Sequence, residues 1–104
     1  MSMKKFEIHF TEEAEEQLLK LENDKSKKGV IKAVGKTLGL MQIDLRHPSL
    51  NTHIFYGIKG QAGEKVFESY AQNKTPGAYR IFWHYGPRER ELTILAIIPH
   101  PDLH

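Results

Sequence analysis

The chain has 104 residues, of which 27% are charged and 39% hydrophobic, and a formal net charge of +2, as expected of one ordinary soluble domain. It contains no cysteine, which excludes disulfides, thiol catalysis and cysteine-ligated zinc. No apolar run approaches the ~20 residues of a membrane span, and the N-terminus lacks the apolar segment of a signal peptide, so we expect a cytoplasmic protein with no membrane partner.

The first half of the chain predicts one strand followed by two helices. Residues 4–10 alternate between apolar and polar side chains, which is the pattern of a half-buried strand. Thr11 is a suitable N-cap for a helix over residues 11–23, and the glutamates after it suit the positive end of the helix dipole. A second apolar stripe runs from Val30 to Met41 at helical spacing, opposite a lysine-rich face. Together these two amphipathic segments predict a helical hairpin.

The second half of the chain predicts four strands. A polar linker over residues 44–53 contains Pro48, which ends the preceding helix. Four strand-like runs follow, at residues 53–58, 64–71, 79–85 and 92–98. The order β-α-α-β-β-β-β therefore predicts a single α+β domain, with an antiparallel sheet and the helical hairpin packed on one face. If the other face is open, we expect the functional site there.

The strand over residues 79–85 carries an arginine that keeps its charge among core-forming neighbours. Alternation predicts a core face for four of its side chains: Tyr79, Ile81, Trp83 and Tyr85. Arg80 is then expected on the exposed face. In the neighbouring run, alternation does not decide whether Lys65 or Glu68 lies beside Arg80. If Glu68 does, the two side chains can form an exposed ion pair worth ~0.2–1 kcal/mol, without any catalytic role.

Histidine is the other titratable residue type of interest. His100 follows the last strand between two prolines, so we expect its side chain at the edge of the sheet. The six histidines form no ligand motif, and we predict no metal site.

The length, the element order and the segment GAYRIFW at residues 77–83 resemble the RelE/ParE superfamily of toxins from bacterial toxin–antitoxin systems. The segment LTILAIIPH at residues 92–100 resembles the last core strand of that fold. Within the superfamily the chain is most similar to a subgroup that carries RHPSL, GEKVFESYAQN and TPGAYRIFW. The resemblance spans the whole chain, and the arginine strand is its most specific mark.

The ribonuclease branch of this superfamily cuts mRNA in the ribosomal A site without a metal or other cofactor. The ribose 2′-hydroxyl attacks the adjacent phosphate, which requires a base, a cation for the developing charge, and an acid. The resemblance implies that Arg80 holds the phosphate and that His100 is the acid. It leaves four candidates for the base: Lys65, Glu68, His47 and His53.

The resemblance also implies partners. Residues from the linker and from the lysine-rich helix face are expected to contact RNA: Arg46, His47, His53, Lys28 and Lys32. A cognate antitoxin would cover the open face, and the ribosome with its mRNA would be the target. Two alternatives remain: a ParE-type inhibitor of DNA gyrase that cuts nothing, and a toxin-fold binding protein without activity.

Overall fold

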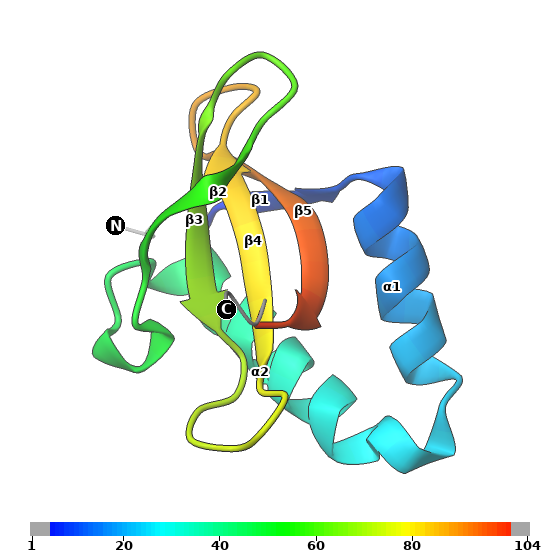
Figure 1. Cartoon of the computed structure of the whole chain (residues 1–104). Helices are drawn as coiled ribbons and strands as arrows, with labels where there is room; N and C mark the ends of the chain where they lie inside the picture. Colours follow the sequence, from blue (N-terminus) through cyan, green and yellow to red (C-terminus); the bar gives the residue numbers. More distant parts are fainter. Residues whose placement is uncertain (1–4, 101–104) are drawn as a thin grey trace.

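The computed structural model describes residues 5–100 and has the element order β1-α1-α2-β2-β3-β4-β5 (Figure 1). The strands are β1 (Glu7–Phe10), β2 (His53–Lys59), β3 (Lys65–Tyr70), β4 (Tyr79–Tyr85) and β5 (Glu91–Pro99). The helices are α1 (Glu12–Glu22) and α2 (Lys28–Ile43), and short 3-10 turns span Lys25–Lys27 and Pro48–Leu50. The predicted α+β fold class is confirmed. The strand expected over residues 4–10 begins at Glu7, and Lys4 lies outside the described residues.

The five strands form one sheet in the order β1-β5-β4-β3-β2. Strands β2 to β5 make the predicted antiparallel meander, because short turns join them. Strand β1 instead pairs in parallel with β5, with Ile8 opposite Leu92 and Phe10 opposite Ile94. No hairpin joins β1 to β5, so nothing forces them to be antiparallel. The sheet is therefore mixed, which differs from the wholly antiparallel sheet that we expected.

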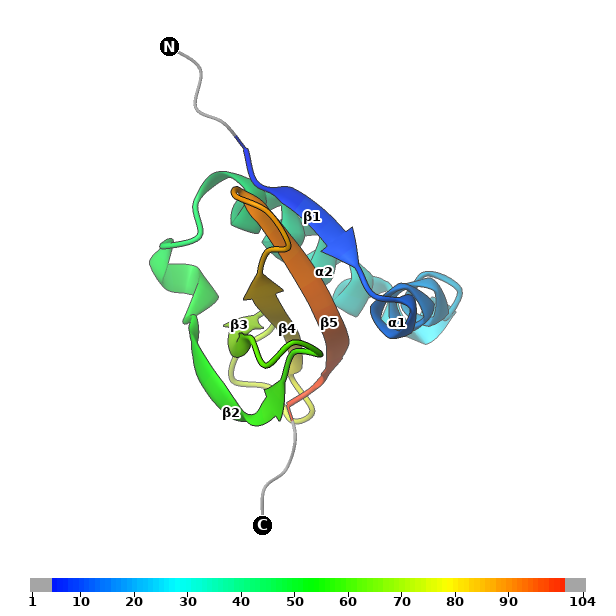
Figure 2. The same cartoon turned by 90° about the horizontal axis from the view of Figure 1, so that it is seen from above.

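The helices form where the sequence predicts them and cover one face of the sheet. The Thr11 side chain caps α1 by accepting a hydrogen bond from the Ala14 amide at 3.1 Å. Helix α2 lies across the sheet and α1 runs alongside β5 (Figures 1 and 2). The core between these layers contains buried residues of both helices, β4 and β5: Ala14, Leu21, Val34, Met41, Ile81, Trp83, Leu92, Ile94 and Ile97. Neither helix within residues 5–100 is long and apolar enough to span a membrane.

The polar linker between α2 and β2 is anchored in the same core. Leu50 ends the 3-10 turn and is fully buried there. Upstream, His47 caps this turn, because its Nδ1 atom accepts a hydrogen bond from the Ser49 amide at 3.2 Å. The buried leucine and the cap fix the point at which β2 starts.

The sheet face opposite the helices is not open, and the expectation that Arg80 is exposed there is wrong. Arg80 is only 8% exposed, and Phe82 beside it is completely buried. Phe82 forms a second apolar cluster with Val66 and Ala96, covered by partly buried side chains that include Phe55 and Ile58 of β2. We call this group the second core.

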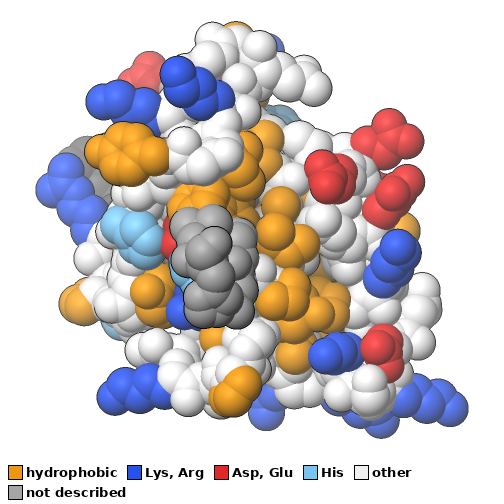
Figure 3. All heavy atoms as spheres, in the orientation of Figure 1, with side chains coloured by type: hydrophobic (Ala, Val, Ile, Leu, Met, Phe, Trp, Pro, Cys, Tyr) orange, Lys and Arg blue, Asp and Glu red, His pale blue; other side chains and the backbone are white. Residues whose placement is uncertain are grey.

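Curvature of the sheet closes this face. The register of the strands shifts between Phe55 and Lys59 in β2 and between Phe82 and Trp83 in β4, and such irregularities bend a sheet. Seen along the strands, β2 curls round to face β5 (Figure 2). A hollow of about 400 Å³ remains between the two, lined in part by Ile58, Leu95 and Ile98. Apolar atoms reach the surface in a band beside β5 (Figure 3).

A core substitution tests whether the second core stabilises the fold. We expect Phe82→Ala to lower the free energy of unfolding by ~3–5 kcal/mol, since it removes a fully buried ring and leaves a cavity. Urea denaturation measures this change. Tyr56→Ala is the control, because Tyr56 is 86% exposed and should change stability by less than ~0.5 kcal/mol. Equal effects of the two substitutions would mean that this face is not a core.

Candidate active site

A buried carboxylate, that of Glu68, lies at the centre of the polar groups on the face away from the helices. Glu68 in β3 is opposite Phe82 in β4 and opposite His53 in β2. Its side chain therefore points to the same side as Phe82, and it is 0% exposed. A carboxylate without access to water needs charged or hydrogen-bonding partners.

Three cationic or titratable side chains surround this carboxylate. The Oε1 atom lies 2.7 Å from Nε2 of His53. The Oε2 atom is in a short hydrogen bond with Nδ1 of His100 and lies 3.5 Å from Nε of Arg80. We call Glu68, His53, Arg80 and His100 the Glu68 cluster. Its members come from β3, β2, β4 and the residue after β5, so four segments distant in sequence converge on one group.

His53 is held between two hydrogen-bond acceptors. Its Nε2 atom faces the Glu68 carboxylate, and its Nδ1 atom lies 2.9 Å from the carbonyl oxygen of Asn51. A carboxylate and a carbonyl only accept hydrogen bonds, so this geometry is satisfied when both ring nitrogens carry a proton. Both ring nitrogens of His53 are therefore engaged by neighbouring groups.

His100 differs from His53, because only one of its ring nitrogens is occupied. Its Nδ1 atom bonds to Glu68, while no residue within 5–100 makes a hydrogen bond to its Nε2 atom. The side chain is 43% exposed, and its backbone amide is anchored to the Ala78 carbonyl at 2.9 Å. His100 thus presents a partly exposed ring, and the carboxylate beside Nδ1 favours the tautomer with a proton on that atom.

The Arg80 guanidinium is held on several sides. Its Cζ atom lies 3.5 Å from the centre of the Tyr70 ring, which is directly opposite in β3. The Nη1 atom donates to the carbonyl oxygens of Gln72 and Tyr79. The buried Nε atom faces Glu68 without a hydrogen-bond partner among the described residues. Only Nη2 is left clear of these groups, so the guanidinium does not present an open two-nitrogen fork.

The cluster can carry an excess of positive charge. The Arg80 guanidinium is paired with the Glu68 carboxylate, and the two histidine rings beside that carboxylate add positive charge when they are protonated. Both rings are partly exposed, so an anionic ligand can reach them.

Several predicted site residues lie outside this cluster. Lys65 projects from the opposite face of β3 to Glu68 and is paired with Lys59 in the strand register. Lys28 and Lys32 are exposed on α2, on the other side of the sheet. Arg46 and His47 line a separate hollow beside the start of β2.

Sequence reasoning missed Tyr70, because its contact with Arg80 depends on a strand register that alternation does not provide.

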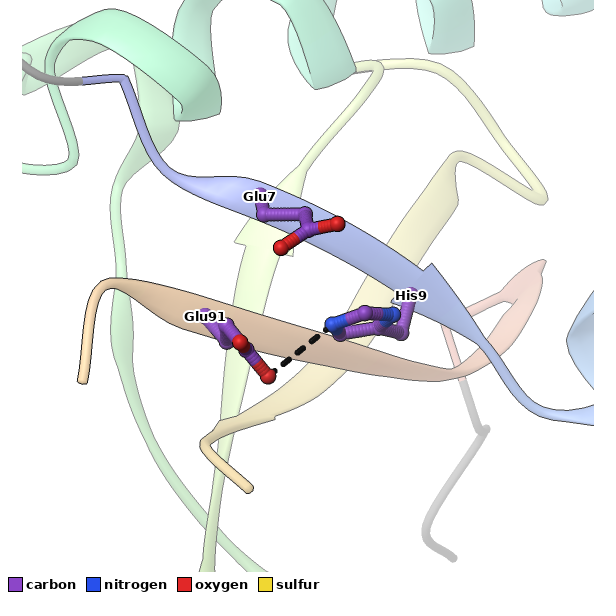
Figure 4. A group of neighbouring side chains, drawn as sticks. All are labelled: Glu7, His9 and Glu91. Carbon is purple, nitrogen blue, oxygen red and sulfur yellow. Dashed lines mark hydrogen bonds and ion pairs between the residues drawn. The ribbon is translucent and has the colours of Figure 1, made fainter. Parts of the chain in front are cut away.

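A second polar group joins β1 to β5 (Figure 4). Ligand atoms of Glu7, His9 and Glu91 lie within 4.8 Å of one another, and Nε2 of His9 is 3.0 Å from Oε1 of Glu91. These are residue types that bind divalent cations. However, Nε of Arg88 donates to the other Glu91 oxygen at 3.1 Å, so a cation already occupies part of the group. The arrangement is that of an ion-pair network that ties the parallel strands together.

This network predicts a pH-dependent contribution to stability. Burial raises the pKa of Glu91, but hydrogen bonds and charges from Arg88 and His9 hold it below its ordinary value of 4.5 overall. A lowered folded-state pKa means that ionised Glu91 stabilises the fold above the unfolded-state pKa, and that this contribution disappears as the pH falls through the folded-state pKa.

We therefore expect Glu91→Gln to be less stable than the wild type near neutral pH, with a difference that shrinks as the pH falls below 4.5. Urea denaturation across a pH series measures the difference. Glu89→Gln, at an exposed position in the same turn, should show little effect at any pH. A Glu91→Gln difference that stays constant down to acidic pH would contradict the network.

Comparisons with known proteins identify the fold of the chain. No protein-family model matches the sequence, and no curated protein matches it. Among solved structures, the archaeal RelE of the RelE–RelB complex from Pyrococcus horikoshii matches with a TM-score of 0.65 at 9% identity, over 94% of this chain and 98% of the other. The Staphylococcus aureus YoeB dimer matches with a TM-score of 0.59 at 13% identity, over 92% and 98%. A YoeB/ParE toxin from Agrobacterium tumefaciens matches with a TM-score of 0.59 at 8% identity, over 91% and 99%. The chain therefore has the fold of the RelE/ParE toxins.

Proposed function

We propose that this protein is the toxin of a toxin–antitoxin pair and that it cuts mRNA on the ribosome without a metal ion. The observation that supports this most directly is the convergence of Arg80, His53 and His100 on one buried carboxylate, where the His100 ring is partly exposed and its Nε2 atom has no partner within residues 5–100. The fold shared with RelE and YoeB supports the same class of function. Its site of action would be the cytoplasm.

The proposed reaction is an attack of the ribose 2′-oxygen on the adjacent phosphorus. The 2′-oxygen gives its proton to solvent water, a five-coordinate phosphorane with added negative charge forms, and the bond to the 5′-oxygen breaks as that oxygen gains a proton. The products are a 2′,3′-cyclic phosphate and a free 5′-hydroxyl. The protein must supply a proton to the leaving oxygen and positive charge near the phosphorane.

His100 is the group we assign to protonation of the leaving oxygen. With Nδ1 donating to Glu68, the imidazolium form carries a second proton on the accessible Nε2 atom. Transfer of that proton leaves a neutral ring whose remaining proton still bonds to the carboxylate. The ring thus keeps its orientation in both protonation states.

Glu68 fits the role of a positioning residue better than that of a base. It is completely buried, and both of its oxygens already accept from cluster members. To take a substrate proton it would have to leave those partners. His53 is similarly engaged, because it could act as a base only after breaking one of its two hydrogen bonds.

Arg80 and His53 would supply the positive charge for the phosphorane. Both are locked by their neighbours, so they need little reorganisation when charge develops. Nη2 of Arg80 can donate to one phosphate oxygen, so we revise the two-oxygen grip inferred from the sequence to a single contact. An antitoxin that shields this positive site would block the reaction, as a cognate partner is expected to do.

Loss of the His100 imidazole should abolish cleavage. We expect His100→Ala to cut mRNA on purified ribosomes about 100- to 10,000-fold more slowly than the wild type, since general acid catalysis contributes a factor of that order. Primer extension on ribosome–mRNA complexes measures the rate of cleavage. His9→Ala is the control, because His9 lies outside the cluster and pairs with Glu91. If the wild type cuts no mRNA but traps gyrase on DNA, the gyrase-inhibitor alternative is correct.

The positioning role of Glu68 predicts non-additive effects. We expect Glu68→Gln to slow cleavage about 10- to 100-fold and to shift the pH–rate profile, because the imidazolium form of His100 loses its carboxylate partner. The Glu68→Gln/His100→Ala double variant should be no slower than His100→Ala alone, since both residues act through one ring. A double variant that shows the product of the two separate losses would mean that Glu68 acts independently of His100. Denaturation curves of the same variants separate this effect from unfolding.

A further inference from the structure

We propose that a hollow beside the start of β2 binds a nucleotide of the same single-stranded RNA, farther along the strand from the one that is cut. The hollow has a volume of about 420 Å³ and is lined by Arg46, His47, Pro48, Asn51, Thr52 and Tyr85, together with Leu45. This size is suited to a small organic ligand. The inference rests on the proposed function, because it names a second contact for the same substrate.

Tyr85 supplies an anchored aromatic surface. It is the last residue of β4 and is 52% exposed. Its ring packs edge-on against Phe67 and Trp83, with ring centres 5.5 Å and 4.9 Å apart. The core thus holds one part of the ring while the rest faces the hollow. A rigid, half-exposed ring is the feature on which unpaired bases stack.

The other side of the hollow supplies hydrogen-bond donors and positive charge. The side chain of Arg46 is exposed and makes no hydrogen bond or ion pair within residues 5–100, while its backbone amide is tied to Asp44 at 3.2 Å. Nδ1 of His47 accepts from the Ser49 amide, so the ring proton of neutral His47 resides on Nε2. An arginine and an imidazole donor beside a tyrosine ring match the phosphate and the base of one nucleotide.

The hollow lies next to the Glu68 cluster, on the other face of the sheet. Asn51 lines the hollow, and its carbonyl oxygen accepts the hydrogen bond from His53 of the cluster. The next residue, Thr52, also lines the hollow and bonds through its hydroxyl to Ser69, which is on the opposite face of β3 to Glu68. Strand β2 is an edge of the sheet. Tyr85 lies three residues along β4 from Phe82, which is opposite Glu68. A single strand of RNA that reaches His100 and continues round this edge would therefore place a nucleotide farther along the strand on Tyr85.

Binding of an RNA that cannot be cut tests the inference. The probe is a short, fluorescein-labelled, single-stranded 2′-O-methyl oligoribonucleotide, which lacks the attacking hydroxyl, and binding is measured by fluorescence anisotropy. We expect Tyr85→Ala to weaken binding about 5- to 150-fold, the range for loss of one base stack. Arg46→Ala should weaken binding about 10- to 150-fold, the range for loss of a hydrogen bond to a charged group. Tyr85→Phe keeps the ring and should bind as the wild type does.

Tyr56→Ala is the matched control, since Tyr56 is more exposed than Tyr85 and does not line the hollow. It should leave binding unchanged. Arg46→Ala is the second test in case Tyr85→Ala misfolds, because Arg46 is exposed and is not a member of either core cluster. The inference is overturned if the wild type does not bind the probe, or if both Tyr85→Ala and Arg46→Ala bind it as tightly as the wild type.

The two proposals can fail separately. Ribosomal mRNA cleavage by the wild type with unchanged probe binding by Tyr85→Ala and Arg46→Ala would remove the nucleotide site alone. Absence of cleavage by the wild type would remove the nuclease, whatever the anisotropy shows. Amide chemical shifts at Asn51, Thr52 and Tyr85 on addition of the probe would locate its binding at the hollow rather than at the cluster alone.

Discussion

Burial of the Glu68 carboxylate is the constraint on which the rest of the structure depends. A carboxylate that is completely removed from water is tolerated only when oppositely charged and hydrogen-bonding groups surround it. Here those groups come from β2, from β4 and from the residue after β5, so the carboxylate requires three other segments to be in place at once. The same requirement fixes the tautomer of His100 and holds Arg80 against Tyr70. Because the buried carboxylate needs all of these groups in place in the folded protein, the cluster is already organised before any ligand binds.

The second core explains how a polar cluster of this kind persists on a sheet face. Val66 precedes Glu68 on the same face of β3, and Phe82 lies directly opposite it in β4, so apolar side chains border the carboxylate. Because β2 curls over these apolar side chains, it limits the access of water to the carboxylate. The lower local dielectric constant strengthens the attraction between Glu68 and the positively charged groups beside it. Packing and electrostatics are therefore coupled here, because the curvature that builds the second core also brings His53 onto Glu68.

Local patterns predict most of the fold, whereas the site depends on long-range pairing. Alternation and helical spacing locate every strand and both helices, since these periods are properties of short segments. The parallel pairing of β1 and the closure of the second face depend on curvature and register, which short segments do not encode. The same distinction holds within the site. Arg80, Glu68, His53 and His100 stand out individually by residue type, but only the register of β3 against β4 selects Glu68 over Lys65 and reveals Tyr70.

The closed environment of Arg80 changes how the site must work. An open guanidinium could bind two phosphate oxygens by itself. In Arg80, however, Nη1 already donates to the carbonyl oxygens of Gln72 and Tyr79, and Nε faces Glu68. His53 is likewise occupied on both nitrogens. In the proposed reaction Arg80 therefore acts mainly as a fixed positive charge, and His100 is the histidine of the cluster whose second ring nitrogen has no partner within residues 5–100. The proposal then places further substrate contacts beyond the cluster, at the start of β2, where an arginine and a half-exposed tyrosine line the same hollow.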